Sequence, residues 1–479
     1  MKKRLVAALL LVAMLVSLLA ACGGEPSETP STPEAPEQGG QTATDVGTYD
    51  GSEVTIKFAH TMGAKLQATL DYHIGEFNKL YPNITIEHNS YGGWGDIAGQ
   101  INTEIAGDNQ PNIAYCYPDH VATYNLAQAV VPMDDFINSQ ATVTHDDGTT
   151  EILGLTAEQI DDFIDGFYSE GSVYGDGKMY TLPLSKSTEV LYYNKTFFEE
   201  NGLTVPTTWE EMEATCQKLL ELDPNCIPLG YDSENNWFIT LCEQYKYDYT
   251  SATGEHYLFN NDNCKAFVKE IREWYQKGYV TTEALYGAYT SGLFTELDKT
   301  ISHSYMCIGS SGGASYQIPE GRAFEVGVAP IPQVDQNNKK VISQGPSLCI
   351  LRGGKTTDQQ IIASWLFVKY LTTNMAFQTE FSSVSGYMPV LESAQENEIY
   401  ANLLASANGY ENLTYLVVKV GLEQADSYFT SPAFNGSSVA REQVGSLLAK
   451  CMSEQASDVD SLINNAFEEA YDECVFLGG

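Results

Sequence analysis

A serine between glycines is the first candidate for chemistry in this chain. Residues 309–313 read Gly-Ser-Ser-Gly-Gly, which fits the G-x-S-x-G pattern of a nucleophilic serine at Ser311. In hydrolases that use this turn, an acid and then a histidine follow the serine along the chain. All seven histidines of this chain precede Ser311. The order argues against such a hydrolase, and we predict a turn that offers free backbone amides and hydroxyls.

Other patterns typical of catalytic, metal or nucleotide chemistry are incomplete. Residues 354–356 read Gly-Lys-Thr, but Cys349 stands where a phosphate-binding loop needs its first glycine. The sequence contains no Cys-x-x-Cys and no His-Glu-x-x-His. We therefore predict no enzymatic activity, no metal and no cofactor. The 63 acidic residues leave the paired carboxylates of a glycosidase open, although no pair stands out.

Aromatic residues are the remaining chemical signal. The chain has 30 tyrosines and 5 tryptophans, and flat aromatic faces can bind sugar rings while polar side chains fix the hydroxyls. Trp94 lies in a glycine-rich turn after a predicted strand, and Trp237 lies in the polar run 232–237, which is predicted to be a loop. Trp365 lies within a helical apolar stripe and is predicted to be core. Trp94 and Trp237 are therefore candidates for ligand contact.

The N-terminus predicts export and anchoring. Three basic residues precede an apolar run from Leu5 to Ala21, as in a secretory signal. The run ends in Leu-Ala-Ala-Cys at residues 19–22, which resembles a bacterial lipobox, in which the cysteine thiol is diacylated. We predict a signal peptide over 1–21 and a lipid anchor at Cys22, on the extracellular face of the cell membrane. A transmembrane anchor is disfavoured because a span needs about 20 apolar residues.

Charge and composition exclude some partners. With 25 basic and 63 acidic residues the net charge is −38, so we predict no nucleic-acid partner, and only the acyl chains can hold the protein at an anionic membrane. Residues 23–50 contain no Lys or Arg and are rich in Pro, Glu, Ser, Thr and Gly, which predicts a disordered tether. Of the ten cysteines, Cys216 and Cys226 are close enough to pair, and buried free thiols are the alternative.

The periodicity of the folded part predicts an α/β architecture. Residues 54–58 and 84–88 are predicted strands, and a helical apolar pattern lies between them. A strand, a helix and a strand in about 35 residues predict a parallel βαβ unit. A helix over about 96–106 and a strand over 111–116 follow. Thr208 and Glu211 fit a capping box that begins a helix ending near Leu222.

Four segments carry a resemblance that covers nearly the whole predicted mature chain: F-N-K-L-Y-P-N-I at 77–84, residues 180–195, P-T-T-W-E-E at 206–211 and G-Y-M-P-V at 386–390. They resemble the family 1 extracellular solute-binding proteins of ABC importers, which include the maltose- and glycerol-3-phosphate-binding proteins. The resemblance implies an α/β, two-lobe, type II periplasmic-binding-protein fold with three interlobe crossings and a hinge. It also implies a monomeric receptor that delivers a carbohydrate ligand to ABC permease subunits.

The resemblance also implies domain boundaries. The crossings are expected near residues 182–187, 342–347 and 384–389, each at a Pro or Gly, where backbone torsions can change during closure. We therefore expect the first lobe to comprise 51–184 and 348–384, and the second 188–343 and 390–479. The ligand would lie in the cleft between them.

Within the family the segments are most similar to the glycerol-3-phosphate-binding branch. The ligand contacts that matching positions imply, together with the two candidate tryptophans and Arg441, are His60, Trp94, Asp119, Ser187, Trp237, Ser310, Ser311, Gly345, Tyr387 and Arg441.

Two departures bear on the ligand. The branch's cleft glutamate falls at Pro118, beside Asp119, and its phosphate-binding arginine falls within 427–430, where this chain has no arginine. We therefore expect a sugar or oligosaccharide. Glycerol-3-phosphate or a glycerophosphodiester is the alternative, because Arg441 could enter the cleft. A tethered surface hydrolase and an adhesin are alternatives of other classes.

Overall fold

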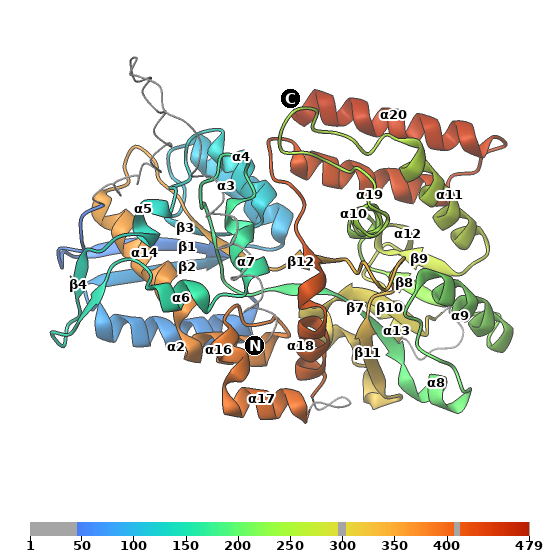
Figure 1. Ribbon diagram of the computed structural model, residues 1–479, viewed down its shortest axis with the longest axis horizontal. Coiled ribbons are helices and arrows are strands. Elements are labelled where there is room, and N and C mark those ends of the chain that lie inside the picture. The colour runs from blue at the N-terminus through green and yellow to red at the C-terminus, as the bar shows by residue number, and fades with distance from the viewer. Residues whose placement is uncertain (1–45, 296–302, 407–411, 479) are drawn as a thin grey trace, which may run out of the picture. The chain divides into compact units, whose positions relative to one another are not determined.

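The computed structural model describes residues 46–295, 303–406 and 412–478. The predicted signal peptide, Cys22 and residues 23–45 of the predicted tether lie outside the described residues. Residues 46–50, which were expected in the disordered tether, instead pack on the first lobe: Val46 and Tyr49 contact its core, and Thr48 Oγ1 donates to the Thr142 carbonyl at 2.8 Å. The described chain contains two large sheets, each with its own hydrophobic core and its own helices (Figure 1). We call each sheet with its packed helices a lobe. Within the described residues, no helix combines the length and the apolar character needed to cross a bilayer.

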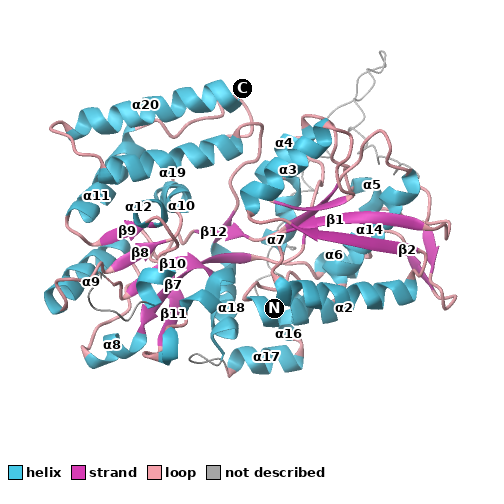
Figure 2. Ribbon diagram, turned by 180° about the vertical axis from the view of Figure 1, so that it is seen from behind, coloured by secondary structure: helices cyan, strands magenta, loops and turns pink. Residues whose placement is uncertain are grey.

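The first sheet has the strand order β2-β1-β3-β13-β6. Strands β1 (Val54–His60), β2 (Ile84–Ser90) and β3 (Ile113–Cys116) are parallel, and β13 (Ser347–Ile350) runs antiparallel to β3 and to β6 (Leu182–Pro183). The predicted βαβ unit is confirmed, with α2 (Ala64–Leu80) as its helix. In Figure 2, α2 and α3 (Trp94–Ala106) lie on opposite sides of this sheet.

The other elements associated with the first sheet are α4 (Pro118–Asn125), α5 (Asp134–Ile137), β4 (Thr142–Thr144), β5 (Thr150–Ile152), α6 (Ala157–Asp161), α7 (Asp165–Ser169), the 3-10 turn η1 (Glu170–Ser172), α14 (Asp358–Thr373), α15 (Met375–Ser385), α16 (Glu392–Glu396) and α17 (Glu398–Ala405). Trp365 of α14 is fully buried in this core, as predicted.

The second sheet has the order β14-β12-β7-β10-β8-β9, and β11 also pairs with β7. Its strands are β7 (Ser187–Asn194), β8 (Leu229–Tyr231), β9 (Val280–Thr282), β10 (Met306–Ser310), β11 (Val326–Pro330), β12 (Val341–Gln344) and β14 (Tyr428–Phe429). The central pairs β7–β10 and β7–β12 are antiparallel, whereas β8, β9 and β10 are parallel to one another.

Helices cover the second sheet on both sides (Figure 2). They are α8 (Lys195–Glu200), α9 (Trp209–Leu222), α10 (Glu234–Tyr245), α11 (Asp262–Gln276), α12 (Glu283–Tyr286), α13 (Ser291–Thr295), the 3-10 turns η2 (Ser311–Gln317), η3 (Glu320–Arg322) and η5 (Ala425–Ser427), α18 (Leu413–Glu423), α19 (Ser437–Ser453) and α20 (Val459–Gly478). The predicted capping box of α9 is confirmed. The Glu211 amide donates to Thr208 Oγ1 at 3.2 Å, and the Thr208 amide donates to Glu211 Oε2 at 3.2 Å.

Two short passages connect the sheets. The chain leaves the first sheet at β6 and enters the second at β7, and it returns between β12 and β13. The first passage comprises residues 184–186, and the second comprises residues 345–346. Farther along, Met388 forms a backbone bridge with Lys186 of the first passage.

Residues 390–400 differ in position from what the resemblance implied. We expected them in the second lobe, but Val390, Leu391, Ala394 and Tyr400 pack in the first core. The Ile164 amide, which donates to the Val390 carbonyl at 3.0 Å, holds this segment there. The chain joins the helices of the second sheet at α18, which packs against β7 and β11.

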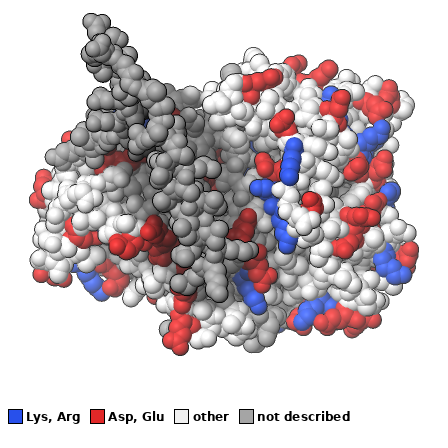
Figure 3. All heavy atoms as spheres, viewed as in Figure 1, with Lys and Arg blue, Asp and Glu red and all other residues white. Residues whose placement is uncertain are grey.

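The nine cysteines from Cys116 to Cys474 are all buried and free within the described chain, Cys216 and Cys226 included. Burial raises the pKa of the Cys216 thiol, which keeps it protonated. Figure 3 shows acidic side chains spread over the visible face, with fewer basic ones among them, in keeping with the net charge of −38.

Candidate functional site

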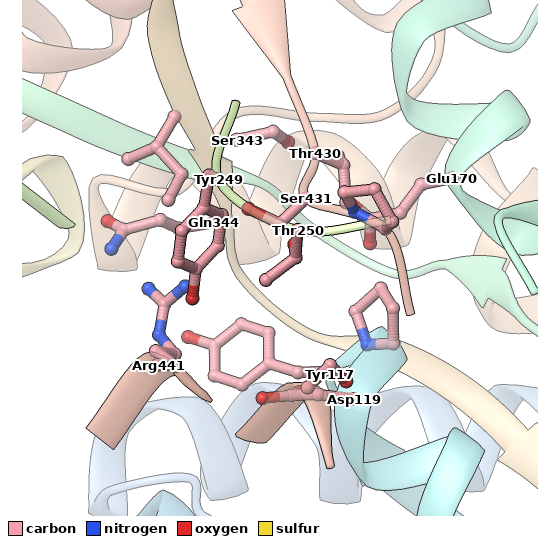
Figure 4. Close-up of a pocket in the computed structure, with 14 residues that line it drawn as sticks. Tyr117, Asp119, Glu170, Tyr249, Thr250, Ser343, Gln344, Thr430, Ser431 and Arg441 are labelled. Carbon is pink, nitrogen blue, oxygen red and sulfur yellow. The ribbon is translucent and has the colours of Figure 1, made fainter. Parts of the chain in front are cut away.

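A cavity with about 660 Å³ of empty space, partly open to solvent, lies between residues of the two lobes (Figure 4). The first lobe contributes the start of α4, residues 117–119, and Glu170 of η1. The second lobe contributes the end of β12, residues 342–344, the loop residues 249–250 and 430–432, and Ser437 and Arg441 of α19. A solute in this cavity would therefore touch both lobes.

Arg441 is the cation that lines this cavity among the described residues. Its Nη2 donates to Oδ1 of Asn236 on α10. Asn236 Nδ2 in turn donates to the buried carboxylate of Glu189 at 2.9 Å, and Tyr231 donates to the other Glu189 oxygen at 2.6 Å. This chain of contacts holds the guanidinium of Arg441, which lines the cavity, in place.

Two tyrosines flank the guanidinium. In Figure 4 the hydroxyl groups of Tyr117 and Tyr249 both point toward Arg441, one from each lobe. Burial raises the pKa of both phenols, while the nearby Arg441 charge opposes the rise. Both phenols therefore stay neutral and can donate or accept hydrogen bonds.

The cavity contains polar atoms without partners. Ser343 Oγ, Gln344 Oε1 and Ser431 Oγ are buried and have no hydrogen-bond partner among the described residues. A buried polar atom without a partner costs roughly 1–3 kcal/mol. Thr250 Oγ1, which also lines the cavity, is a fourth such atom. Four such atoms in one cavity indicate a site shaped for a ligand with several hydroxyl or other polar groups.

Five of the expected ligand contacts gather at the cavity. Asp119 and Arg441 line it directly. Trp94, Gly345 and Tyr387 surround its Tyr117. The Trp94 ring lies 4.2 Å from the Tyr117 ring, and Gly345 and Tyr387 are among the neighbours that influence the pKa of the Tyr117 phenol.

The three expected serines lie near the passages between the lobes. Ser187 is buried at the start of β7 and pairs with Gln344, which lines the cavity. Ser310 caps η2 by accepting from the Gly312 amide at 3.2 Å. Ser311 is fully buried and accepts from the Thr188 amide at 3.3 Å, so its hydroxyl is not presented as a nucleophile.

His60 is built into the first lobe. It is fully buried, its Nε2 lies 2.9 Å from His88 Nδ1, and its Nδ1 accepts from the Met62 amide at 3.1 Å. Burial, and then the neighbouring His88, lowers the pKa of His60 to about 4. His60 is therefore neutral at physiological pH, and it is not among the residues that line the cavity.

The prediction that Trp237 lies in a loop is wrong. The polar run before it begins helix α10, with Ser233 as the N-cap that accepts from the Asn236 amide. Trp237 is 1% exposed, stacks on Tyr231 at 4.7 Å between ring centres and packs with Trp209 in the second core. Polar residues at 232–236 therefore reflect helix capping and not a solvated loop.

Several cavity residues had no signal in the sequence. Glu170, Tyr249 and Ser431 lie in segments without a motif, and they meet only because the two lobes approach each other. Ser343 and Gln344 lie in the expected second crossing, which could have singled them out. Within the described chain, no group of three or more His, Cys, Asp or Glu side chains is arranged to hold a metal ion.

Glu189 makes the stability of the second lobe depend on pH. Burial raises the pKa of its carboxyl to about 7, although hydrogen bonds from Tyr231 and Asn236 oppose the rise. The folded protein therefore binds a proton that the unfolded chain releases between about pH 4.5 and 7, so this group's contribution to stability falls as pH rises through that window.

We expect the free energy of unfolding, measured by urea titration at pH 5, 6, 7 and 8, to fall more steeply for the wild type than for Glu189→Gln. Glu283, whose pKa burial also raises to about 7, is present in both proteins and cancels in the comparison. Parallel pH profiles would show that Glu189 does not titrate in this range.

Comparisons with known proteins identify the family of this chain. Residues 74–407 match the model of the bacterial extracellular solute-binding protein family. The sn-glycerol-3-phosphate-binding periplasmic protein UgpB of Escherichia coli (strain K12) is 24% identical over 360 residues, which cover 71% of this chain and 75% of that protein.

Solved structures share the fold. UgpB from Mycobacterium tuberculosis, in complex with glycerophosphocholine, superposes with a TM-score of 0.70 at 17% identity over 88% of this chain and 99% of its own. A cyclic α-maltosyl-1,6-maltose-binding protein from Arthrobacter globiformis gives 0.68 at 18% identity, over 88% and 99%. The two-lobe α/β fold predicted from the sequence is thereby confirmed.

Proposed function

Because the chain belongs to the bacterial extracellular solute-binding proteins, which serve ABC importers, we propose that it binds a sugar or oligosaccharide between its lobes and delivers it to the permease. The observation that supports this ligand class is the set of partnerless polar atoms in the cavity, at Thr250, Ser343, Gln344 and Ser431. Hydroxyl groups of a sugar can both donate and accept, so they suit such a mixed set.

Aromatic rings support the same ligand class. Trp94 lies beside Tyr117, with the two rings tilted by 36°, and Tyr117 lines the cavity, so the first lobe has an aromatic ring next to polar groups there. Sugar rings present C–H faces and hydroxyl edges that fit such a combination. Asp119, in the same helix start, supplies a carboxylate that can accept from hydroxyls.

A phosphate-bearing polyol is the second candidate. Arg441 in the cavity favours it, because a guanidinium binds phosphate through paired hydrogen bonds. The curated relative binds sn-glycerol-3-phosphate by its name, and the solved relative holds glycerophosphocholine. The Asp119 carboxylate in the same cavity opposes a dianion, and for that reason we place the neutral sugar first.

We further propose that the protein is a non-enzymatic monomer held at the outer face of the cell membrane through Cys22, with residues 23–45 as the tether. The relatives are binding proteins, which supports a receptor without catalysis. The lipobox-like residues 19–22 support the anchor. Radiolabelled palmitate incorporated into the wild type and not into Cys22→Ala would test it.

A thermal-shift screen tests the proposed solute. We expect one of maltose, maltotriose, sn-glycerol-3-phosphate or glycerophosphocholine to raise the Tm by about 3 °C at a hundredfold excess over its Kd, because binding to the folded state alone adds about 2.7 kcal/mol. Analysis of the incubated solute by mass spectrometry is the control. A solute that is consumed, with no Tm shift from any of the four, would contradict the receptor.

A further inference from the structure

A buried ion pair lies where the chain passes between the lobes. Lys186, between β6 and β7, has a fully buried side chain, and Glu170 of η1 is 3% exposed. Lys186 Nζ donates to Glu170 Oε1. Burying two charges is costly unless their remaining hydrogen bonds are met. The partners of the two side chains therefore indicate what the pair does.

Lys186 connects three separate segments of the chain. Its Nζ donates to Ser347 Oγ at 3.0 Å and lies 3.5 Å from the Gly345 carbonyl oxygen, both in the second passage. Its backbone N–H donates to the Met388 carbonyl at 3.1 Å, and its carbonyl accepts from the Met388 amide at 2.6 Å. One residue thus joins the first passage, the second passage and the segment at 388.

The two passages also touch through their backbones. Gly345 has φ +96°, and a Cβ there would lie 2.6 Å from the Ser185 carbonyl oxygen and 2.9 Å from Lys186 Cα. A side chain at this position would meet backbone atoms that cannot move aside. The close approach places the Gly345 carbonyl within reach of the lysine.

Glu170 extends the contact to the second lobe. Its Oε1 also accepts from Ser347 Oγ at 3.2 Å, and its Oε2 accepts from Thr430 Oγ1 at 3.0 Å. Glu170 follows Phe167 of the first core, whereas Thr430 follows β14 of the second sheet. Both residues line the cavity, so this hydrogen bond joins the lobes at the wall of the ligand site.

We propose that the Lys186–Glu170 pair is the positioning element of the hinge. The pair holds the two passages and the segment at 388 in register. Through the hydrogen bond from Thr430 to Glu170, it also favours the closed form, in which both lobes line the cavity. Opening of the two lobes would separate Thr430 from the Glu170 carboxylate, while the ion pair between Lys186 and Glu170 would remain intact. Losing a hydrogen bond to a charged group disfavours the open form and shifts the population toward closure. The inference rests on the proposed function, since a poised hinge serves a receptor that closes on a solute.

Variants of Thr430 test the link between the lobes. We expect Thr430→Val, which keeps shape and removes the hydroxyl, to raise the open-to-closed ratio about tenfold. Small-angle X-ray scattering of the protein without solute should then give a larger radius of gyration. Thr430→Ser keeps the hydroxyl and should scatter like the wild type. Equal scattering from all three proteins would overturn the link.

Variants of the ion pair test its role in the passages. Lys186→Met leaves the Glu170 charge buried without its partner, and we expect the Tm to fall by about 4 °C. In Lys186→Met/Glu170→Gln the charges are gone, so most of that loss should be recovered. Amide exchange at residues 184–187 and 345–347 should nevertheless be at least tenfold faster than in the wild type.

A double variant with the wild-type Tm and the wild-type rate of amide exchange would show that the two charges do not hold the passages in place, and the proposal would be wrong. If Lys186→Met alone does not fold, the double variant and the Thr430 series still decide. No measurement here uses a solute. A failure of the solute screen and a failure of the hinge are therefore distinguishable.

Discussion

Trp237→Ala is expected to lower the free energy of unfolding by about 3–5 kcal/mol, the cost of removing a large buried aromatic side chain. Trp237 is 1% exposed, stacks on Tyr231 with a 10° angle between the rings, and lies 5.8 Å from the Trp209 ring. Alanine would leave a cavity within the second core that its neighbours can only partly fill. Urea unfolding followed by fluorescence measures the loss.

The matched control for this prediction is Trp94→Ala. Trp94 is half-buried and stands next to Tyr117 at the cavity, so we expect a smaller loss of stability and a larger loss of solute-induced Tm shift. Comparing the loss of stability and the loss of solute-induced Tm shift in the two variants thus distinguishes a core residue from a ligand-site residue. If the Trp237→Ala protein unfolds like the wild type but its Tm no longer rises with solute, Trp237 would be a ligand-site residue and our assignment to the core would be wrong.

Arg441→Met is expected to weaken binding of the solute found by the screen about 10- to 100-fold, which corresponds to about 1.5–3 kcal/mol for a hydrogen bond to a charged group. The guanidinium is hydrogen-bonded to Asn236 and lines the cavity, and the hydroxyl groups of Tyr117 and Tyr249 point toward it. Methionine keeps much of the volume and removes the charge and the donors. Isothermal titration calorimetry measures the change in Kd.

Arg352→Met is the control for charge, because Arg352 is exposed and does not line the cavity. It changes the net charge equally and should leave Kd unchanged. Equal Kd values for the wild type and both variants would remove Arg441 from the site.

Salt separates the two ligand classes at this arginine. For a neutral sugar, the wild-type Kd should hardly change between 50 and 500 mM NaCl, since no net charge is neutralised. For a phosphate-bearing solute, the Kd should rise with salt, because screening weakens the attraction to the guanidinium. The same titrations therefore test both the role of Arg441 and the class of the solute.

The motifs of the sequence indicated the family, and its local patterns predicted the α/β character. They succeeded because each depends on neighbours along the chain. The βαβ unit follows from strand and helix periods over residues 54–88, and the start of α9 follows from Thr208 and Glu211 three residues apart. Family motifs then ordered these pieces into two lobes.

Only the tertiary structure decided which residues form the site. Glu170 and Thr430 are 260 residues apart, and Arg441 meets Asn236 across 205 residues, so no spacing in the sequence relates them. Trp237 was misplaced for a related reason, because the same polar run can be a loop or a helix cap, and only packing against Tyr231 decides. Burial and the approach of distant segments set these outcomes, and neither is a local property of the chain.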